Sequence, residues 1–146
     1  MRIPQIAVAA LGLFVVVTAA RAADRSVGEA KAAEAVAEVK RKIAAKVIEC
    51  PDKKCLTAKE TACVPSHARL EHGTLEGQFV AEDWFVHRGA DGKCSATLVL
   101  DLTRDSYGKC RVLVRDCASV AAASSDSWDT MGCVQHEFWR NPVCKR

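Results

Sequence analysis

The sequence predicts an α+β fold in which an N-terminal helix packs on a four- or five-stranded antiparallel sheet that disulfides staple. Three observations support this prediction: a helical apolar repeat near the N-terminus, strand-like alternation after Ser66, and eight cysteines. The chain has 146 residues, which is the size of one domain. We expect residues 23–146 to form this domain and residues 1–22 to be removed from it.

Residues 1–22 have the parts of a secretory signal peptide. Arg2 supplies a positive charge, an apolar run follows at 6–17, and Ala20 and Ala22 form a small-residue cleavage motif. We expect cleavage after Ala22. The apolar run is shorter than the roughly 20 residues that cross a bilayer, so no membrane span is expected. The protein is therefore expected outside the cytoplasm, either extracellular or periplasmic.

The charge of the chain argues against nucleic acid as a partner. The formal net charge is +3, and removing Arg2 and Arg21 with the signal leaves the domain almost neutral. Nonspecific nucleic-acid binding requires a strong positive field, which such a domain lacks. Lys40 and Lys42 belong to a basic cluster that we interpret as the solvated face of a helix, with a polyanion-binding patch as the alternative.

The cysteines indicate a disulfide framework. An even number of cysteines in an exported chain predicts four disulfides, with the pairing left open. Some spacings, such as Cys63 to His67, also resemble zinc sites. Because exported thiols are oxidised, we expect no metal and no other cofactor. The predicted disulfide cysteines are Cys50, Cys55, Cys63, Cys94, Cys110, Cys117, Cys133 and Cys144.

Two helices are predicted before the sheet. Ser26 and Glu29 fit a capping box, which predicts a helix that begins there and ends before Pro51. We expect its apolar stripe to pack on the sheet of the same chain, with a coiled-coil partner as the alternative. A second capping signature at 57–60 predicts a short second helix. The stripe of the first helix consists of Ala32, Val36, Val39, Ile43 and Val47.

The period of the apolar pattern changes to two after Ser66. The predicted strands are 67–76, 79–88, 94–103 and 109–117, with a weaker fifth strand at 133–144 and an irregular segment at 118–131. Short connections make them an antiparallel meander. If each strand has one apolar face, Leu98 lies opposite Val112, Leu100 lies opposite Cys110, and Cys110 faces the core.

One candidate catalytic group arises from the first predicted hairpin. A two-residue turn at Gly77 and Gln78 places His72 opposite Asp83, with His87 farther along the same face. An imidazole beside a carboxylate can perform general acid–base catalysis, as in small secreted ribonucleases. The alternative is that these histidines have structural roles.

A candidate binding surface lies near the C-terminus. Trp128, Phe138 and Trp139 lie in or beside a segment between two cysteines. Tryptophan is enriched at interface hot spots, and a closed loop lowers the ordering cost of binding. The alternative is that these rings cover an open sheet face. We expect Trp84, which is in mid-strand, to belong to the core.

The order of elements and one pentapeptide resemble the cystatin family of cysteine-protease inhibitors. The pentapeptide is Gln78-Phe79-Val80-Ala81-Glu82. In that family a Gln-x-Val-x-Gly hairpin, an N-terminal glycine and a tryptophan-bearing hairpin form the inhibitory wedge. The resemblance implies contact roles for Gln78, Val80, Gly28 and Trp139, although Glu82 stands where the family has glycine.

These observations lead to two functional hypotheses. The first is a monomeric, non-enzymatic module that binds an unidentified protein, with inhibition of an extracellular enzyme as one form of this activity. Its predicted contact residues are Gly77, Gln78, Trp128, Phe138 and Trp139. The second is a small hydrolase that uses His72, Asp83 and His87.

Overall fold

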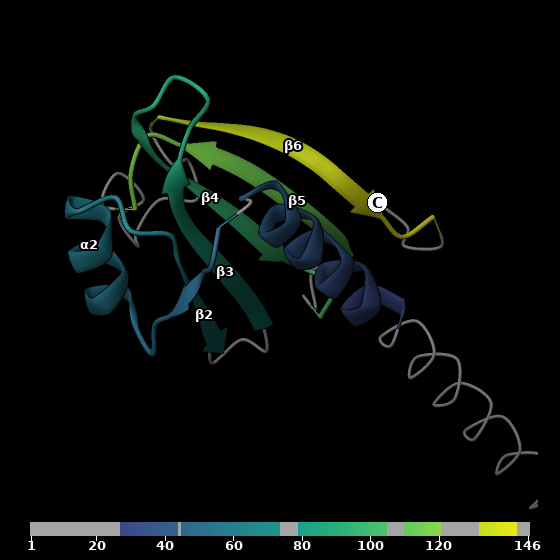
Figure 1. Cartoon of the computed structure of the whole chain (residues 1–146). Helices are drawn as coiled ribbons and strands as arrows, with labels where there is room; N and C mark the ends of the chain where they lie inside the picture. The colour runs from purple at the N-terminus through teal and green to yellow at the C-terminus, as the bar shows by residue number, and fades with distance from the viewer. Residues whose placement is uncertain (1–26, 44, 74–78, 105–109, 121–131, 143–146) are drawn as a thin grey trace, which may run out of the picture.

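The computed structural model describes residues 27–43, 45–73, 79–104, 110–120 and 132–142, and these form an α+β structure (Figure 1). The N-terminal helix occupies 27–42, and helix α2 occupies Lys53–Thr61. The strands are β1 (Ile48–Glu49), β2 (Ser66–Gly73), β3 (Phe79–Arg88), β4 (Cys94–Asp101), β5 (Arg111–Cys117) and β6 (Cys133–Arg140).

The strands form one sheet in the order β1 to β6. Every neighbouring pair is antiparallel except β1 and β2, which are parallel. The predicted fold class is therefore confirmed, but the sheet has six strands in the described part of the chain. The strand absent from the prediction is β1, whose two residues are too short to give an alternating pattern.

Several predicted features lie outside the described residues. They are the signal peptide at 1–22 with its cleavage site, Gly77, Gln78, Trp128 and Cys144. Within the described ranges, no helix combines the length and apolar composition needed to cross a membrane.

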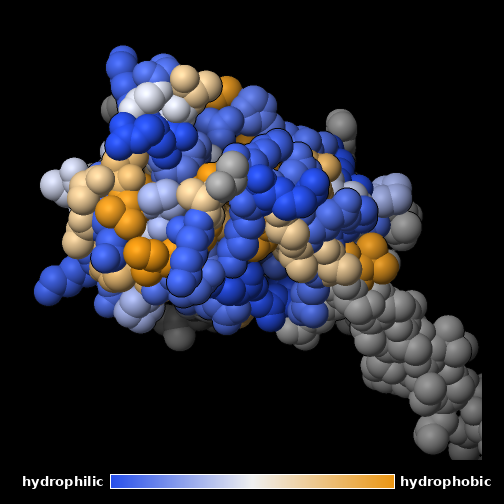
Figure 2. Space-filling model, in the orientation of Figure 1, coloured by the Kyte–Doolittle hydropathy of each residue, from blue (hydrophilic) through white to orange (hydrophobic). Residues whose placement is uncertain are grey.

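The N-terminal helix packs on the sheet through small side chains. Its side chains Ala32, Ala35 and Val39 are buried against the sheet. Gly28 lies so close to Thr103 that an added Cβ would be 2.6 Å from the threonine Cβ. The helix ends before Val47, earlier than predicted. The reason is that the backbone N–H of Ile48 bonds to the Pro65 carbonyl, so the chain leaves the helix to form β1. The face of the molecule shown in Figure 2 is mainly hydrophilic, with small separate hydrophobic patches.

Helix α2 begins and ends with recognisable caps. The Asp52 carboxylate accepts a hydrogen bond from the Cys55 N–H at 2.7 Å, so the helix starts earlier than the signature at 57–60 predicted. At the other end, the N–H of Val64 bonds to the Lys59 carbonyl and the N–H of Cys63 bonds to the Glu60 carbonyl. These two bonds define a Schellman motif.

Both faces of the sheet are covered. On one face, here called the α2 face, Leu56 of α2 packs with Trp84, Leu98 and Leu113. On the other, here called the helix face, Ala32, Ala35 and Val39 of the N-terminal helix pack with Phe85, Val99 and Val112. The predicted core position of Trp84 is confirmed, as it is 2% exposed.

The predicted register between β4 and β5 is wrong. Leu98 lies opposite Arg115, Leu100 lies opposite Leu113, and Val112 lies opposite Asp101. Cys110 precedes β5 instead of pairing with Leu100. The prediction assumed one apolar face per strand, whereas β5 buries Leu113 on one face and Val112 on the other. Apolar alternation therefore cannot select the register of this strand.

The disulfide prediction is confirmed in part. Cys50 is bonded to Cys55, and Cys117 of β5 is bonded to Cys133 of β6. Cys110 is disulfide-bonded as well. Cys63 and Cys94 carry free thiols in this structure.

Candidate functional site

The structure does not assemble the predicted catalytic group. His72 lies opposite Val80, and Asp83 lies opposite Arg69. The predicted pairing of His72 with Asp83 is wrong because residues 74–78 separate β2 from β3, instead of a two-residue turn. The two side chains also point to different faces of the sheet. The His72 ring is 3.7 Å from the Glu82 carboxylate, and Glu82 lies on the same face of β3 as Trp84, which is the α2 face.

Asp83 instead belongs to an ionic network on the helix face, in which Asp83 and His67 are buried and their other partners are partly exposed. Its carboxylate contacts the His67 Nε2 at 2.9 Å and the Arg69 guanidinium at 2.6 Å. The other ring nitrogen of His67 contacts the Glu49 carboxylate at 2.5 Å, and the ring stacks on Phe85. Both nitrogens of His67 are thus engaged by protein carboxylates. We conclude that this network has a structural role, since neither nitrogen is open to a substrate.

The network also holds β1 against the sheet. Partial burial favours the protonated form of Glu49, but hydrogen bonds from Lys40 and His67 favour the carboxylate and lower the pKa of Glu49. Glu49 therefore stays ionised at neutral pH. Through it, one residue of the short strand β1 is fixed to both the N-terminal helix and β2.

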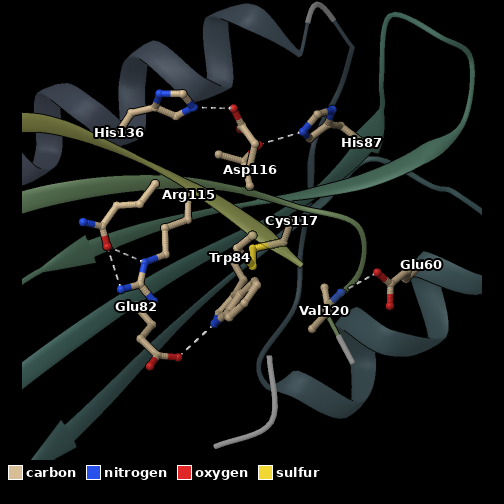
Figure 3. The surroundings of a disulfide bond; sticks show 12 residues. Glu60, Glu82, Trp84, His87, Arg115, Asp116, Cys117, Val120 and His136 are labelled. Carbon is tan, nitrogen blue, oxygen red and sulfur yellow. Dashed lines mark hydrogen bonds and ion pairs between the residues drawn. A yellow bond between two sulfur atoms is a disulfide. The ribbon is translucent and has the colours of Figure 1, made fainter. Parts of the chain in front are cut away.

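A second polar cluster on the helix face is open to solvent. The His87 Nε2 lies 2.9 Å from the Thr97 hydroxyl, which donates to the Asp116 carboxylate at 3.1 Å. The other oxygen of Asp116 is 3.4 Å from the His136 Nε2. Figure 3 shows the two histidine rings on either side of Asp116. This arrangement, called the Asp116 cluster below, brings together His87, which the sequence singled out, and His136.

The Asp116 cluster borders a groove of about 490 Å³. The groove runs between the second half of the N-terminal helix and strands β3 to β6. Its polar lining includes Lys42 and Glu137 beside the two histidines. The apolar side chains in the groove are Val39, Ile43, Val114 and Phe138.

Phe138 and Trp139 have mainly a packing role. Both are half-buried and pack against the core beneath the N-terminal helix. They lie on β6 where its register with β5 shifts between Val112 and Leu113. A bulge of this kind allows two consecutive side chains to approach the same face. Both rings thus pack over the sheet, and Phe138 also lines the groove.

The residues that carry the cystatin resemblance lie in different environments. Val80 is buried on the α2 face, and Gly28 is buried against Thr103 within the N-terminal helix. Trp139 is half-buried on β6, and Gln78 is outside the described residues.

Strand β6 is the last strand of the sheet, and nothing in the described ranges pairs with its outer side. Most of its residues are exposed, and the Val134 side chain is 63% exposed. The N–H of Ala118 bonds to the Gly132 carbonyl, and backbone groups alternate in direction along an antiparallel strand. The N–H groups of Val134 and His136 therefore point to β5, and the N–H group of Gln135 points outward. Among the described residues, the backbone donors and acceptors on the outer edge of β6 therefore have no strand partner, and they lie next to the groove.

Sequence reasoning missed Arg69, Thr97 and Asp116, and it considered His67 only as a possible zinc ligand. The alternation of His67, Arg69 and Asp83 along two strands was visible, but it becomes a network only with the correct register. No three His, Cys, Asp or Glu side chains among the described residues are grouped as a metal site.

Comparisons with family models, curated proteins and solved structures give no match to this chain, so the proposed function rests on the geometry of the site.

Proposed function

We propose that the protein is an exported protein-binding module that takes up an extended segment of a partner protein along the outer edge of β6. The observation that carries the proposal is this eight-residue strand, which has no neighbour on its outer side in the described part of the sheet and borders the groove. Edge strands bind peptides by adding them to the sheet, with the backbone supplying affinity and pockets supplying specificity.

The two parts of the surface have separate roles in this proposal. The outward N–H and C=O groups around Gln135 pair with the partner backbone, while alternate partner side chains reach the groove. Its apolar side, including Val114 and Phe138, suits an aliphatic or aromatic side chain. The disulfide between Cys117 and Cys133 fixes the start of β6 to β5, which reduces the ordering cost of binding.

The proposal predicts that edge substitutions on β6 weaken peptide binding. Peptides selected from a displayed library are expected to slow amide exchange along β6. Gln135→Pro removes an outward N–H and is expected to weaken their binding at least about fivefold, because a lost hydrogen bond to a partner costs roughly 1 kcal/mol or more. Val134→Asp is expected to do the same by placing a charge at the edge.

The matched control is Ile48→Asp, because Ile48 is an exposed apolar residue on β1, at the opposite end of the sheet. It should leave the peptide affinity unchanged. The proposal fails if the selected peptides protect amides elsewhere, or if Gln135→Pro, shown by circular dichroism to be folded, binds them with full affinity. By the cystatin resemblance, a cysteine protease is the first whole protein to test as a partner.

The Asp116 cluster supports a second candidate function, general acid–base hydrolysis. Two histidines flank one carboxylate at the rim of a groove, and the His136 side chain is 57% exposed. One imidazole would take a proton from the nucleophile while the other donates a proton to the leaving group.

This second function predicts turnover that depends on the cluster. With RNA as substrate, His136→Ala and His87→Ala are each expected to lower kcat about 100-fold or more. His72→Ala is the control, since His72 is exposed on the other face and should not affect turnover. Wild-type protein without measurable hydrolysis, or turnover that persists in His136→Ala, excludes this candidate and leaves the binding function untouched.

A further inference from the structure

Two free thiols meet where α2 ends against the sheet. Cys63 directly follows the C-terminal turn of α2, and Cys94 is the first residue of β4. The Glu60 carbonyl accepts a hydrogen bond from the Cys63 N–H at 2.9 Å and another from the Cys94 thiol at 3.4 Å. The Cys63 thiol in turn contacts the carbonyl of His87, next to the residue that pairs with Cys94. One shared carbonyl and two adjoining strands therefore bring the two sulfur atoms together.

The backbone at Cys63 supports a role for its thiol. Cys63 has a φ of 48°, in the left-handed region, at the helix-terminal position that glycine usually occupies. A residue with a Cβ is disfavoured there. A cysteine at this position therefore has no conformational advantage, and the feature that distinguishes it is the sulfur directed at Cys94.

The other cysteines that the structure describes are oxidised. Cys50, Cys55, Cys117 and Cys133 are in disulfides, and Cys110 is disulfide-bonded. Cys63 and Cys94 are both partly exposed, so a small disulfide reagent can reach them. An adjacent, partly exposed pair of thiols, in a structure whose other described cysteines are oxidised, has the arrangement of a redox couple.

We propose that Cys63 and Cys94 form a reversible dithiol–disulfide pair whose oxidation bonds the end of α2 to the start of β4. The oxidant is a low-molecular-weight disulfide, written RSSR. The Cys63 thiolate attacks one sulfur of RSSR, which gives a mixed disulfide on Cys63 and releases one RSH. The Cys94 sulfur then attacks the Cys63 sulfur, closes the protein disulfide and releases the second RSH. The protein loses two hydrogens and the oxidant gains them.

The order of attack follows from the surroundings of Cys94. Burial and the neighbouring Cys63 thiol raise the pKa of Cys94 to about 11, so its thiol is protonated at neutral pH. Because the thiolate is the nucleophile, exchange begins at Cys63. Once the mixed disulfide has formed, the neighbouring Cys94 completes the reaction within the molecule. The product fastens α2 at both ends, since the Cys50–Cys55 bond already holds its first turn.

The test is a redox titration of the full chain with reduced and oxidised glutathione, followed by alkylation and peptide mapping. We expect Cys63 and Cys94 to lose alkylation together in one two-electron transition, and a linked Cys63–Cys94 peptide to appear. The thermal midpoint should rise on oxidation, because the new bond ties two elements together. In Cys94→Ser, which cannot close the ring, Cys63 should accumulate a stable mixed disulfide with glutathione.

The Cys63→Ser variant is the matched control. It should accumulate less mixed disulfide than Cys94→Ser under the same conditions, because burial, the largest cause of the raised pKa of Cys94, remains in this variant. The proposal is overturned if wild-type protein collects glutathione on both cysteines without a linked peptide, if the two thiols titrate independently, or if either pairs with another cysteine. The wild-type titration alone decides these outcomes, so it does not depend on how the variants fold.

Discussion

Replacement of Asp83 by alanine is expected to lower the free energy of unfolding by about 3–5 kcal/mol, the usual cost of removing one partner from a buried ion pair. The Asp83 side chain is 2% exposed and contacts both His67 and Arg69. Its loss leaves the buried His67 ring without an acceptor at Nε2. Urea unfolding followed by tryptophan fluorescence measures the change, because Trp84 is buried in the fold.

Glu71→Ala provides the matched control for this prediction. Glu71 contacts the same Arg69 guanidinium at 3.2 Å, but its side chain is half exposed. A surface ion pair of this kind contributes at most about 1 kcal/mol, so the variant should unfold near the wild-type midpoint. If the two variants lose the same free energy of unfolding, the burial of Asp83 is not the source of its contribution to stability.

Replacement of Trp84 by alanine is expected to cost about 3–5 kcal/mol as well, because it leaves a cavity in the core of the α2 face. Trp84 packs there with Leu98 and Leu100, and its indole N–H donates to the Glu82 carboxylate at 2.9 Å. Far-ultraviolet circular dichroism during urea unfolding is the suitable measurement, because the substitution removes a fluorophore.

Two further variants separate the contributions of Trp84. Trp84→Phe keeps most of the ring but loses the bond to Glu82, so its loss should be clearly smaller. Trp139→Ala removes a half-buried tryptophan at the sheet edge and should also cost less. A Trp84→Ala variant with nearly wild-type stability would contradict the placement of this ring at the centre of the α2-face core.

Local signals in the sequence predicted the elements better than their pairing. The predicted strand at 79–88 matches β3, and the one at 94–103 contains β4. Alternation marks a strand without help from its neighbours, but register depends on which face each neighbour buries. With Val112 and Leu113 buried on opposite faces, the pattern of β5 fits more than one register.

The candidate site was predictable only in fragments. His87 was recognised, but its partners Thr97, Asp116 and His136 come from three other strands. The length of the connection between β2 and β3 decided whether His72 or Arg69 lies opposite Asp83. The turn residues at Gly77 favoured a two-residue connection, and this choice shifted the predicted register along the whole hairpin. A site whose side chains come from several strands is therefore predicted wrongly whenever the register of one of those strands is wrong.

The small side chains on the N-terminal helix also matter while the protein is being made. Every strand from β3 to β6 pairs with the strand before it, so the meander can form from contacts close in sequence, which favours rapid folding. The helix is synthesised first, yet its packing partners Phe85, Val99 and Val112 follow many residues later. During that interval its buried stripe has no partner. Because two of its three most buried positions are Ala32 and Ala35, the waiting segment offers less apolar surface for aggregation than a stripe of large side chains would.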